Sequence, residues 1–279
     1  MNPWYALCEA LPIEMLRWDF MKNAMLAILL ISPLFGLMSP MVVTGKMSFF
    51  SDALGHSAFT GIAIGCICGL TMPTLAAVIF CLAFSLLFSF VLNRSNHATD
   101  TIIGVFSSAA VALGIFIATL DGGSFAKYNA YLIGDILSVT PEQIAMLALL
   151  LLSMIVFWVL CGNRLALTLI HPQLAASRGI KTKITQAIFN AAVALVVTLT
   201  ISGVGLLILN SLLVLPAATA KNLSKSWKQY HLFSVLLALA AGIGGLTASY
   251  YLGCSAGAAI SLILSLLFAI SFMLRKWRA

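Results

Sequence analysis

The segment KMSFFSDALGHSAFTGIAIGCICG, residues 46–69, places an aspartate and a histidine inside a stretch that is otherwise mostly apolar or small. If this segment is helical, Ser48, Asp52, His56 and Thr60 recur every four residues and form one polar stripe, because side chains four apart lie over one another. The segment therefore predicts a helix that belongs to a membrane and carries one polar face.

A second stripe on the same predicted helix consists of small residues, Ser57, Gly61, Gly65 and Gly69. The hydrophobic effect cannot drive helices together in lipid, so their association depends on close packing, which small residues at this spacing permit. We expect this small stripe to accept the backbone of a neighbouring helix.

Asp52 and His56 lie one turn apart, and two interpretations of them are open. Ionisable groups at membrane depth are costly and usually face a pathway or a partner, and a carboxylate oxygen with an imidazole nitrogen suits a divalent transition metal. Alternatively, Asp52 stabilises the first turn of the helix and His56 is simply hydrogen-bonded to it.

The composition indicates a polytopic membrane protein. Of 279 residues, 62% are hydrophobic and 8% are charged, and the mean hydropathy is +1.08, which is too apolar for a soluble domain. The net charge of +7 could suggest nucleic-acid binding, but the cations are scattered between apolar segments rather than gathered on one face. The six cysteines are interpreted as small buried hydrophobes, not as disulfides or a zinc cluster.

Residues 1–22 are too polar to span, and their Trp4, Tyr5 and Trp18 suit an interfacial segment. No cleavable signal peptide is expected. Crossings of about 20 residues fit the ~30 Å of hydrocarbon, and nine are predicted: 24–43, 50–70, 73–92, 100–120, 141–161, 184–202, 203–220, 231–251 and 255–274.

The distribution of positive residues predicts the orientation. A cytoplasmic C-terminus leaves only Arg17, Lys22 and Lys127 outside. The N-terminus is then expected outside. The cations placed inside are Lys46, Arg94, Arg164, Arg178, Lys181, Lys183, Lys221, Lys225, Lys228, Arg275, Lys276 and Arg278.

Two further segments are distinctive. The connection RLALTLIHPQLAASRGIKTK, 164–183, is too polar to span, and a short helix is expected to start at His171 and Pro172 and to end at Gly179. Pro216 lies inside an apolar run and should kink or break its helix, since proline removes a backbone hydrogen bond.

These segments resemble the permease family of bacterial ABC transporters for manganese, zinc and iron. The matching stretches occur in the family's order and cover nearly the whole chain. They are GKMSFFSDALGHSAFTGIAIG (45–65), DTIIGVFSSAAVALG (100–114), YLIGDILSVTPE (131–142), HPQLAASRGI (171–180) and GLLILNSLLVLPAATA (205–220).

The resemblance implies an all-α polytopic membrane protein with about 8–9 transmembrane helices, of the metal-chelate type of ABC importer permease. It implies one transmembrane permease domain over 1–279, with an interfacial segment at 1–22 and a cytoplasmic coupling segment at 164–183. The expected location is the inner membrane of a bacterium. The expected partners are a cytoplasmic ABC ATPase, an extracytoplasmic metal-binding protein and a second permease chain, forming a homodimer or a pair.

The resemblance also assigns roles to residues. Asp52 and His56 are the expected contacts of a transported divalent metal, zinc being favoured over manganese and iron from the stretch 131–142. No permanently bound cofactor is expected. The residues expected to seat on the ATPase are His171, Pro172, Leu174, Ala175, Arg178 and Gly179.

The residues leave two other functions as alternatives. An ion-coupled secondary carrier could use intramembrane Asp and His for protons, but the two halves show no convincing inverted repeat. An intramembrane metalloenzyme is poorly supported by four histidines without an HExxH motif. The chain lacks a GxxxxGK[ST] loop, so ATP hydrolysis is expected on another polypeptide.

Overall fold

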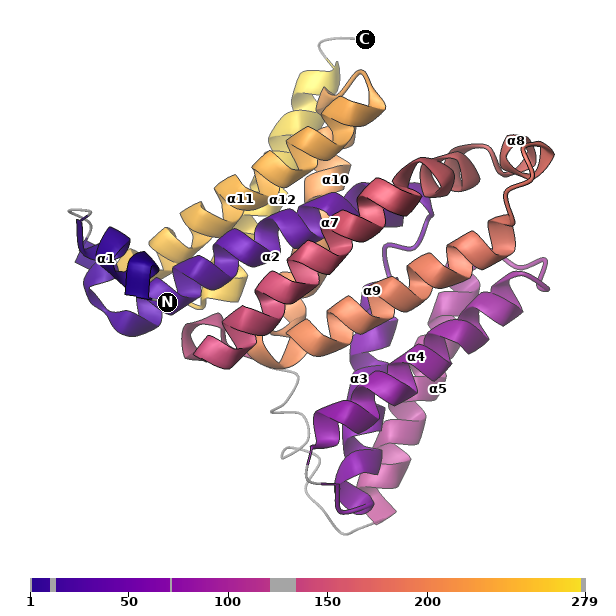
Figure 1. The fold of residues 1–279 in the computed structure, drawn as a ribbon, viewed down its shortest axis with the longest axis horizontal. Coiled ribbons are helices and arrows are strands. Elements are labelled where there is room, and N and C mark those ends of the chain that lie inside the picture. The colour runs from indigo at the N-terminus through magenta and orange to yellow at the C-terminus, as the bar shows by residue number, and fades with distance from the viewer. Residues whose placement is uncertain (1, 11–13, 71, 121–133, 277–279) are drawn as a thin grey trace. The chain divides into compact units, whose positions relative to one another are not determined.

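The computed structural model describes residues 2–10, 14–70, 72–120 and 134–276, and every regular element among them is a helix (Figure 1). Lys127 and Arg278, which entered the orientation argument, lie outside the described residues. The elements are α1 (Asn2–Ala10), η1 (Glu14–Arg17), α2 (Asp19–Thr44), α3 (Phe50–Ile67), α4 (Pro73–Leu92), α5 (Thr99–Leu120), η2 (Ile136–Ser138), α7 (Pro141–Ile170), α8 (Pro172–Ser177), α9 (Thr182–Val204), α10 (Leu206–Leu223), α11 (Trp227–Leu252) and α12 (Ala256–Lys276).

Eight of the described helices are long and apolar enough to cross a membrane, namely α2, α4, α5, α7, α9, α10, α11 and α12. This confirms the predicted all-helical, multi-pass membrane protein. The predicted crossing at 50–70 corresponds to α3, which is not among the eight. Asp52 and His56 lower the hydropathy of α3. The same two residues therefore keep α3 out of this set of apolar helices and make it a candidate site.

By contacts within the chain, the molecule divides into two compact units. The first unit comprises Met1–Pro40, Asp135–Val156 and Gly203–Ala279, and the second comprises Met41–Gly134 and Phe157–Ser202. Each unit is described separately below. The expectation of one transmembrane domain over 1–279 stays a prediction.

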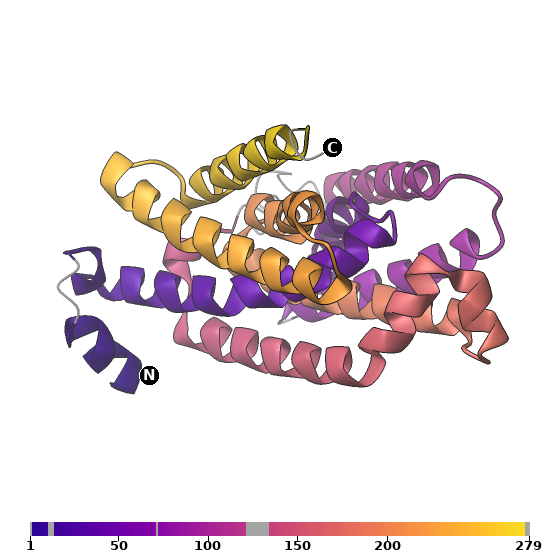
Figure 2. The same cartoon turned by 90° about the horizontal axis from the view of Figure 1, so that it is seen from above.

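Glycines bring the helices of the first unit close together. A Cβ on Gly245 of α11 would lie 2.5 Å from Ile260 Cγ1 of α12, and one on Gly36 of α2 would lie 2.8 Å from Val235 Cα of α11. Figure 2 shows α11 and α12 from above, as the two helices at the yellow end of the colour scale. Only glycine permits these separations, because any side chain would require a backbone to move.

Helices α9 and α10 are separated by Gly205 alone, whose φ of +88° is readily adopted by glycine. Helix α10 then continues through Pro216 to Leu223, so the proline does not break the helix, and the kink that the sequence predicts as the other outcome stays a prediction. Ser39 Oγ of α2 accepts a hydrogen bond from the backbone N–H of Ala217, 3.2 Å away. A neighbouring helix thus supplies a hydrogen-bond partner beside the proline.

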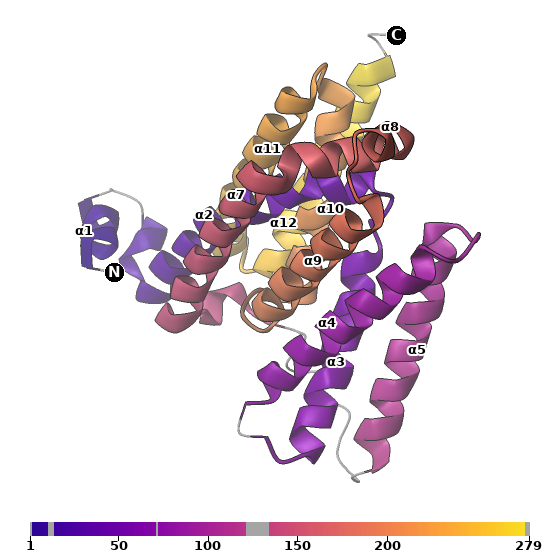
Figure 3. The ribbon, with the colours of Figure 1, turned by 45° about the vertical axis from the view of Figure 1, so that its right-hand side comes forward.

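Aromatic stacking and one polar bridge hold the second unit together. The ring centroids of Phe50 in α3 and Phe88 in α4 lie 4.7 Å apart, and Phe106 of α5 contacts Phe88 edge-on at 5.7 Å. Asn190 of α9 donates from Nδ2 to Ser89 Oγ of α4 over 2.8 Å. Figure 3 shows α3, α4 and α5 grouped together.

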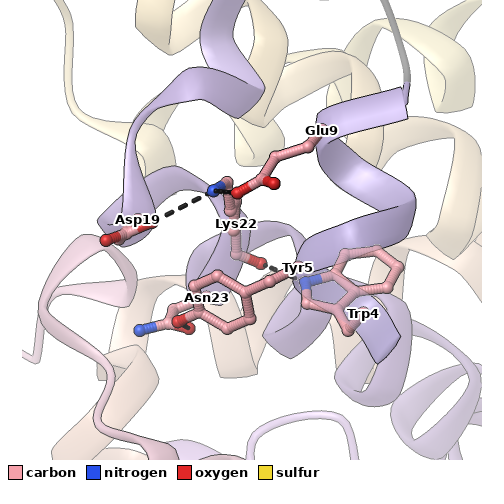
Figure 4. Close-up of polar contacts among 6 residues, drawn as sticks. All are labelled: Trp4, Tyr5, Glu9, Asp19, Lys22 and Asn23. Carbon is pink, nitrogen blue, oxygen red and sulfur yellow. Dashed lines mark hydrogen bonds and ion pairs between the residues drawn. The ribbon is translucent and has the colours of Figure 1, made fainter. Parts of the chain in front are cut away.

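The N-terminal helix α1 is attached to the start of α2 (Figure 4). Trp4 Nε1 donates to the Lys22 carbonyl over 3.0 Å, and the Tyr5 hydroxyl donates to Asn23 Oδ1 over 2.6 Å. Helix α2 begins at Asp19, before the predicted residue 24. The prediction began too late because residues 1–22, with their charges, were too polar to span, whereas the Lys22 side chain is 4% exposed and paired.

Candidate metal site on helix α3

Helix α3 is almost completely enclosed by the second unit. Every residue from 50 to 63 is buried except Asp52 and His56, which are partly exposed. Phe49, directly before the helix, is 66% exposed and lies about one turn before Asp52. The two ionisable residues therefore occupy an open window on a helix whose other faces are covered.

The two side chains of this window are close to each other. His56 Nε2 lies 3.6 Å from Asp52 Oδ2, with side-chain exposures of 35% and 44%. Two ligands of a tetrahedral zinc ion, each ~2.1 Å from the metal, are roughly 3.4 Å apart. The pair can therefore contact one ion with little adjustment, and it can equally form the hydrogen-bonded pair of the structural interpretation.

The predicted small stripe explains why the window faces away from α4. A Cβ on Gly61 would lie 2.5 Å from Ala77 Cα, and one on Gly65 would lie 2.9 Å from Ala76 Cβ, both on α4. This confirms close packing for these two glycines. Gly69 has no such neighbour; it lies beyond the helix with a φ of +66°. Gly69 instead forms the left-handed turn after the helix, a backbone conformation that glycine adopts at little cost.

The predicted polar stripe is divided by the tertiary structure. Thr60 is fully buried, and its Oγ1 donates to the Ala110 carbonyl of α5 over 2.7 Å. Gly114 permits this approach, since a Cβ there would lie 2.6 Å from Thr60 Oγ1. Ser48 lies in the turn before α3. Of the four predicted residues, only Asp52 and His56 both belong to α3 and are partly exposed.

Among the residues that the structure describes, no group of three or more His, Cys, Asp and Glu side chains could hold a metal. Asp52 and His56 supply two ligand atoms, whereas zinc sites in proteins are usually four-coordinate. Further ligands would come from outside the described residues, for example from water or from another chain.

The coupling segment contains the short helix that the sequence predicts. Helix α8 starts at Pro172 and is followed by Gly179, with a φ of +74° and a backbone hydrogen bond from Ile180 N–H to the Ala175 carbonyl. Ala175 is buried and anchors the helix, while Leu174 is 44% exposed. The other residues assigned to ATPase coupling, His171, Pro172, Arg178 and Gly179, are also exposed.

Two arrangements were missed at the sequence level. The first is the ion pairing of Lys22 with Glu9 and Asp19. The second is the convergence of Arg164, Arg178 and Lys181 on one pocket, treated below. The only signal for either in the sequence was positive charge beside an apolar segment, which also describes an ordinary topology signal.

Comparison with known proteins gives a family match over most of the chain. The model of the ABC 3 transport family matches residues 17–275. The chain is 28% identical over 239 residues to the "High-affinity zinc uptake system membrane protein ZnuB" of Haemophilus influenzae, covering 84% of this chain and 90% of that protein. It is 29% identical over 263 residues to the "Manganese import system permease protein ScaB" of Streptococcus gordonii, covering 92% of each.

The fold also matches a solved structure, "PsaBC from Streptococcus pneumoniae in complex with Fab". The TM-score is 0.79 at 24% sequence identity, over 98% of this chain and 95% of the other. At this identity the match concerns the fold, and it agrees with the multi-pass helical architecture described above.

Proposed function

Because this chain belongs to the ABC 3 transport family, we propose that it is the membrane-spanning permease of an ATP-driven importer of a divalent transition metal. The observation that carries the proposal is the open window on α3, where Asp52 Oδ2 and His56 Nε2 are 3.6 Å apart. The remainder of α3 up to residue 63 is buried, so this face is the part of the helix that an ion or a second chain can reach.

In the proposed mechanism, two copies of the chain bring their α3 windows toward one pathway. Two Asp52 and two His56 then provide two oxygen and two nitrogen ligands, a set compatible with tetrahedral zinc. Partial exposure of both side chains lets the ion exchange water for protein ligands and leave again.

We propose zinc as the cargo, with manganese and ferrous iron as the alternatives. The relatives named above include one named for zinc uptake and one named for manganese import. The N and O ligand set accommodates all three metals once waters complete the coordination shell. The preference for zinc comes from the resemblance of residues 131–142 to zinc permeases.

The energy is proposed to come from a separate cytoplasmic ATPase that contacts α8, and the metal from an extracytoplasmic binding protein. Helix α8 supports this role because it is short and anchored by buried Ala175, and it exposes Leu174 and Arg178. An exposed leucine on a polar connection provides apolar surface that a partner would remove from water.

The test is metal uptake by cells that lack this chain and carry a plasmid copy, with labelled zinc, manganese and iron compared directly. Asp52→Asn and His56→Gln should each abolish most uptake per inserted molecule, because an amide is a much poorer metal ligand than a carboxylate or an imidazole. Matched controls are Asp100→Asn and His97→Gln, which make the same changes at exposed positions of the same unit outside α3.

Uptake close to that of the unmodified chain in either α3 variant, with normal membrane insertion, would remove that residue from the metal pathway. The hydrogen-bonded structural pair would then be the better interpretation. Loss of insertion without loss of activity per inserted molecule would lead to the same conclusion.

A further inference from the structure

A pocket of about 490 Å³ lies between the C-terminal part of α7 and the start of α9, beside α8. Figure 1 shows α8 at the turn that joins these two helices. All of its lining residues belong to the second unit. None of them is part of the α3 window, so the pocket is separate from the proposed metal site, although Arg178 and Gly179 are also among the residues assigned to ATPase coupling.

Three cations converge on this pocket from different places in the chain. Arg164 comes from α7, whereas Arg178 and Lys181 lie on either side of Gly179. The left-handed φ of Gly179, +74°, turns the chain from α8 back toward α9, which places both residues beside α7. Arg164 is 14 residues from Arg178 and 17 from Lys181 in the sequence, yet all three line one cavity.

No acidic side chain among the described residues neutralises the positive charge of the pocket. Arg164, Arg178 and Lys181 are all exposed, and none of them has an ion-pair partner among the residues that the structure describes. The described acidic residues of this unit are Asp52 and Asp100, and neither lines the pocket. A ligand with negative charge would therefore meet three unpaired cations.

The other part of the lining is apolar. It includes Phe157 of α7 and Ile184 and Ile188 of α9. The two isoleucines are 53% and 52% exposed. They lie on a helix long and apolar enough to span a membrane, so lipid can reach them. A soluble anion such as free phosphate would leave these side chains uncovered, whereas a hydrocarbon chain would cover them.

The pocket also lies at a suitable depth for a lipid headgroup. Helix α7 has 30 residues and is therefore ~45 Å long, more than the ~30 Å of hydrocarbon. Arg164 lies in its last third, where a long cationic side chain reaches the headgroup layer. The distribution of positive residues predicts that the same end of α7 lies on the cytoplasmic side, where anionic lipids attract basic residues.

We propose that this pocket binds one anionic phospholipid, with its phosphate headgroup at Arg164, Arg178 and Lys181 and an acyl chain along Ile184 and Ile188. The bound lipid would join the C-terminal side of α8 to α7 and α9. It would thus steady the helix that presents Leu174. Lipid binding is a property of this chain alone and does not depend on the metal or on the transport function.

The test is native mass spectrometry of the full-length chain, incubated with equal amounts of dioleoyl phosphatidylglycerol and dioleoyl phosphatidylcholine. We expect preferential retention of phosphatidylglycerol. Each exposed cation near an anionic surface contributes about fivefold to binding, so Arg164→Gln/Arg178→Gln/Lys181→Gln should lose more than about tenfold of that preference. The matched control, Lys183→Gln/Lys225→Gln/Lys228→Gln, removes the same charge from exposed positions outside the pocket lining and should keep it.

Two further measurements keep the proposal testable if the triple variant does not fold. Arg178→Gln and Lys181→Gln alone change exposed residues and should each lower the preference about fivefold, while Arg178→Lys should keep most of it. Excess inorganic phosphate should not displace the lipid. Equal retention of the two lipids by the unmodified chain, equal loss in the control variant, or displacement by phosphate would each overturn the proposal.

Discussion

Lys22 Nζ lies 3.1 Å from Glu9 Oε1, although the two residues belong to different helices and the Lys22 side chain is only 4% exposed. Asp19 Oδ1 lies at the same distance on the other side, and the Tyr5 ring centroid is 5.0 Å away. Both carboxylates are largely exposed, at 68% and 76%. Lys22 is thus the buried member of the cluster. Its ion pair with Glu9 holds α1 against α2, because Glu9 neutralises the buried ammonium.

This asymmetry predicts that removing the acids is worse than removing the lysine. Glu9→Gln with Asp19→Asn leaves a buried ammonium without its anions, and the Tm should fall. Lys22→Met removes the buried charge itself and should lower the Tm less, because the acids can remain in water. The variant that carries all three substitutions should have the same Tm as Lys22→Met alone. A double-mutant cycle based on thermal unfolding measures this coupling between the lysine and the two acids. Glu14→Gln, an exposed acid outside the cluster, is the control; an additive triple variant would contradict the coupling.

The second prediction concerns the contact that positions the α3 window. Gly61→Ala would bring a Cβ to 2.5 Å from the Ala77 backbone, so α3 or α4 must shift. The expected loss of stability is about 1–3 kcal/mol, with metal uptake reduced as well. Gly104→Ala is the matched control, since nothing lies within 4 Å of its Cβ, and it should gain about 0.5–1 kcal/mol. Thermal unfolding of the two variants measures this difference. Equal stability of the two variants would show that close α3–α4 packing at Gly61 does not contribute to the stability of the protein.

The third prediction separates the fold of α8 from its contact with a partner. Leu174 is 44% exposed, so Leu174→Asp should leave insertion and thermal stability close to normal. Uptake and co-purification of the ATPase should be lost, because the interface would bury an unpaired charge. Gln173→Asp places the same charge on the neighbouring exposed residue of α8 and should be tolerated better. Normal uptake by Leu174→Asp would remove this residue from the coupling contact.

The fourth prediction concerns Cys8 of α1, which is 1% exposed. Burial raises the pKa of its thiol above the ordinary value, and the nearby Lys22 charge only partly opposes this effect. The thiolate is the reactive form, so in a variant with Cys8 as its single cysteine alkylation should be slow and should still accelerate above pH 9. The folded pKa is raised, so stability is retained at low pH and declines as the pH rises past the pKa of the unfolded thiol. An alkylation rate that is half-maximal near pH 8.5, as for a free thiol, would show that α1 opens readily.

Much of the fold was predictable from the sequence because the membrane constrains the chain so strongly. Lipid offers no hydrogen bonds to the backbone, so apolar segments of sufficient length must be helices, and their number and order could be predicted almost completely. Local chemistry was also sufficient for α8, where Pro172 starts the helix and Gly179 adopts the left-handed turn after it. The pairing of Asp52 with His56 follows from their four-residue spacing on one helix.

The tertiary structure alone decided which polar residues remain accessible. Thr60 shares the spacing of Asp52 and His56, yet it is buried because the Ala110 carbonyl of α5 accepts its hydrogen bond. The partners of Lys22 and the convergence of Arg164 with Lys181 likewise depend on which helices pack together. The sequence by itself determined the helices and their polar faces, since both depend on neighbours along the chain. Only packing between segments far apart in sequence determined which of those faces is covered, because burial depends on where other helices lie.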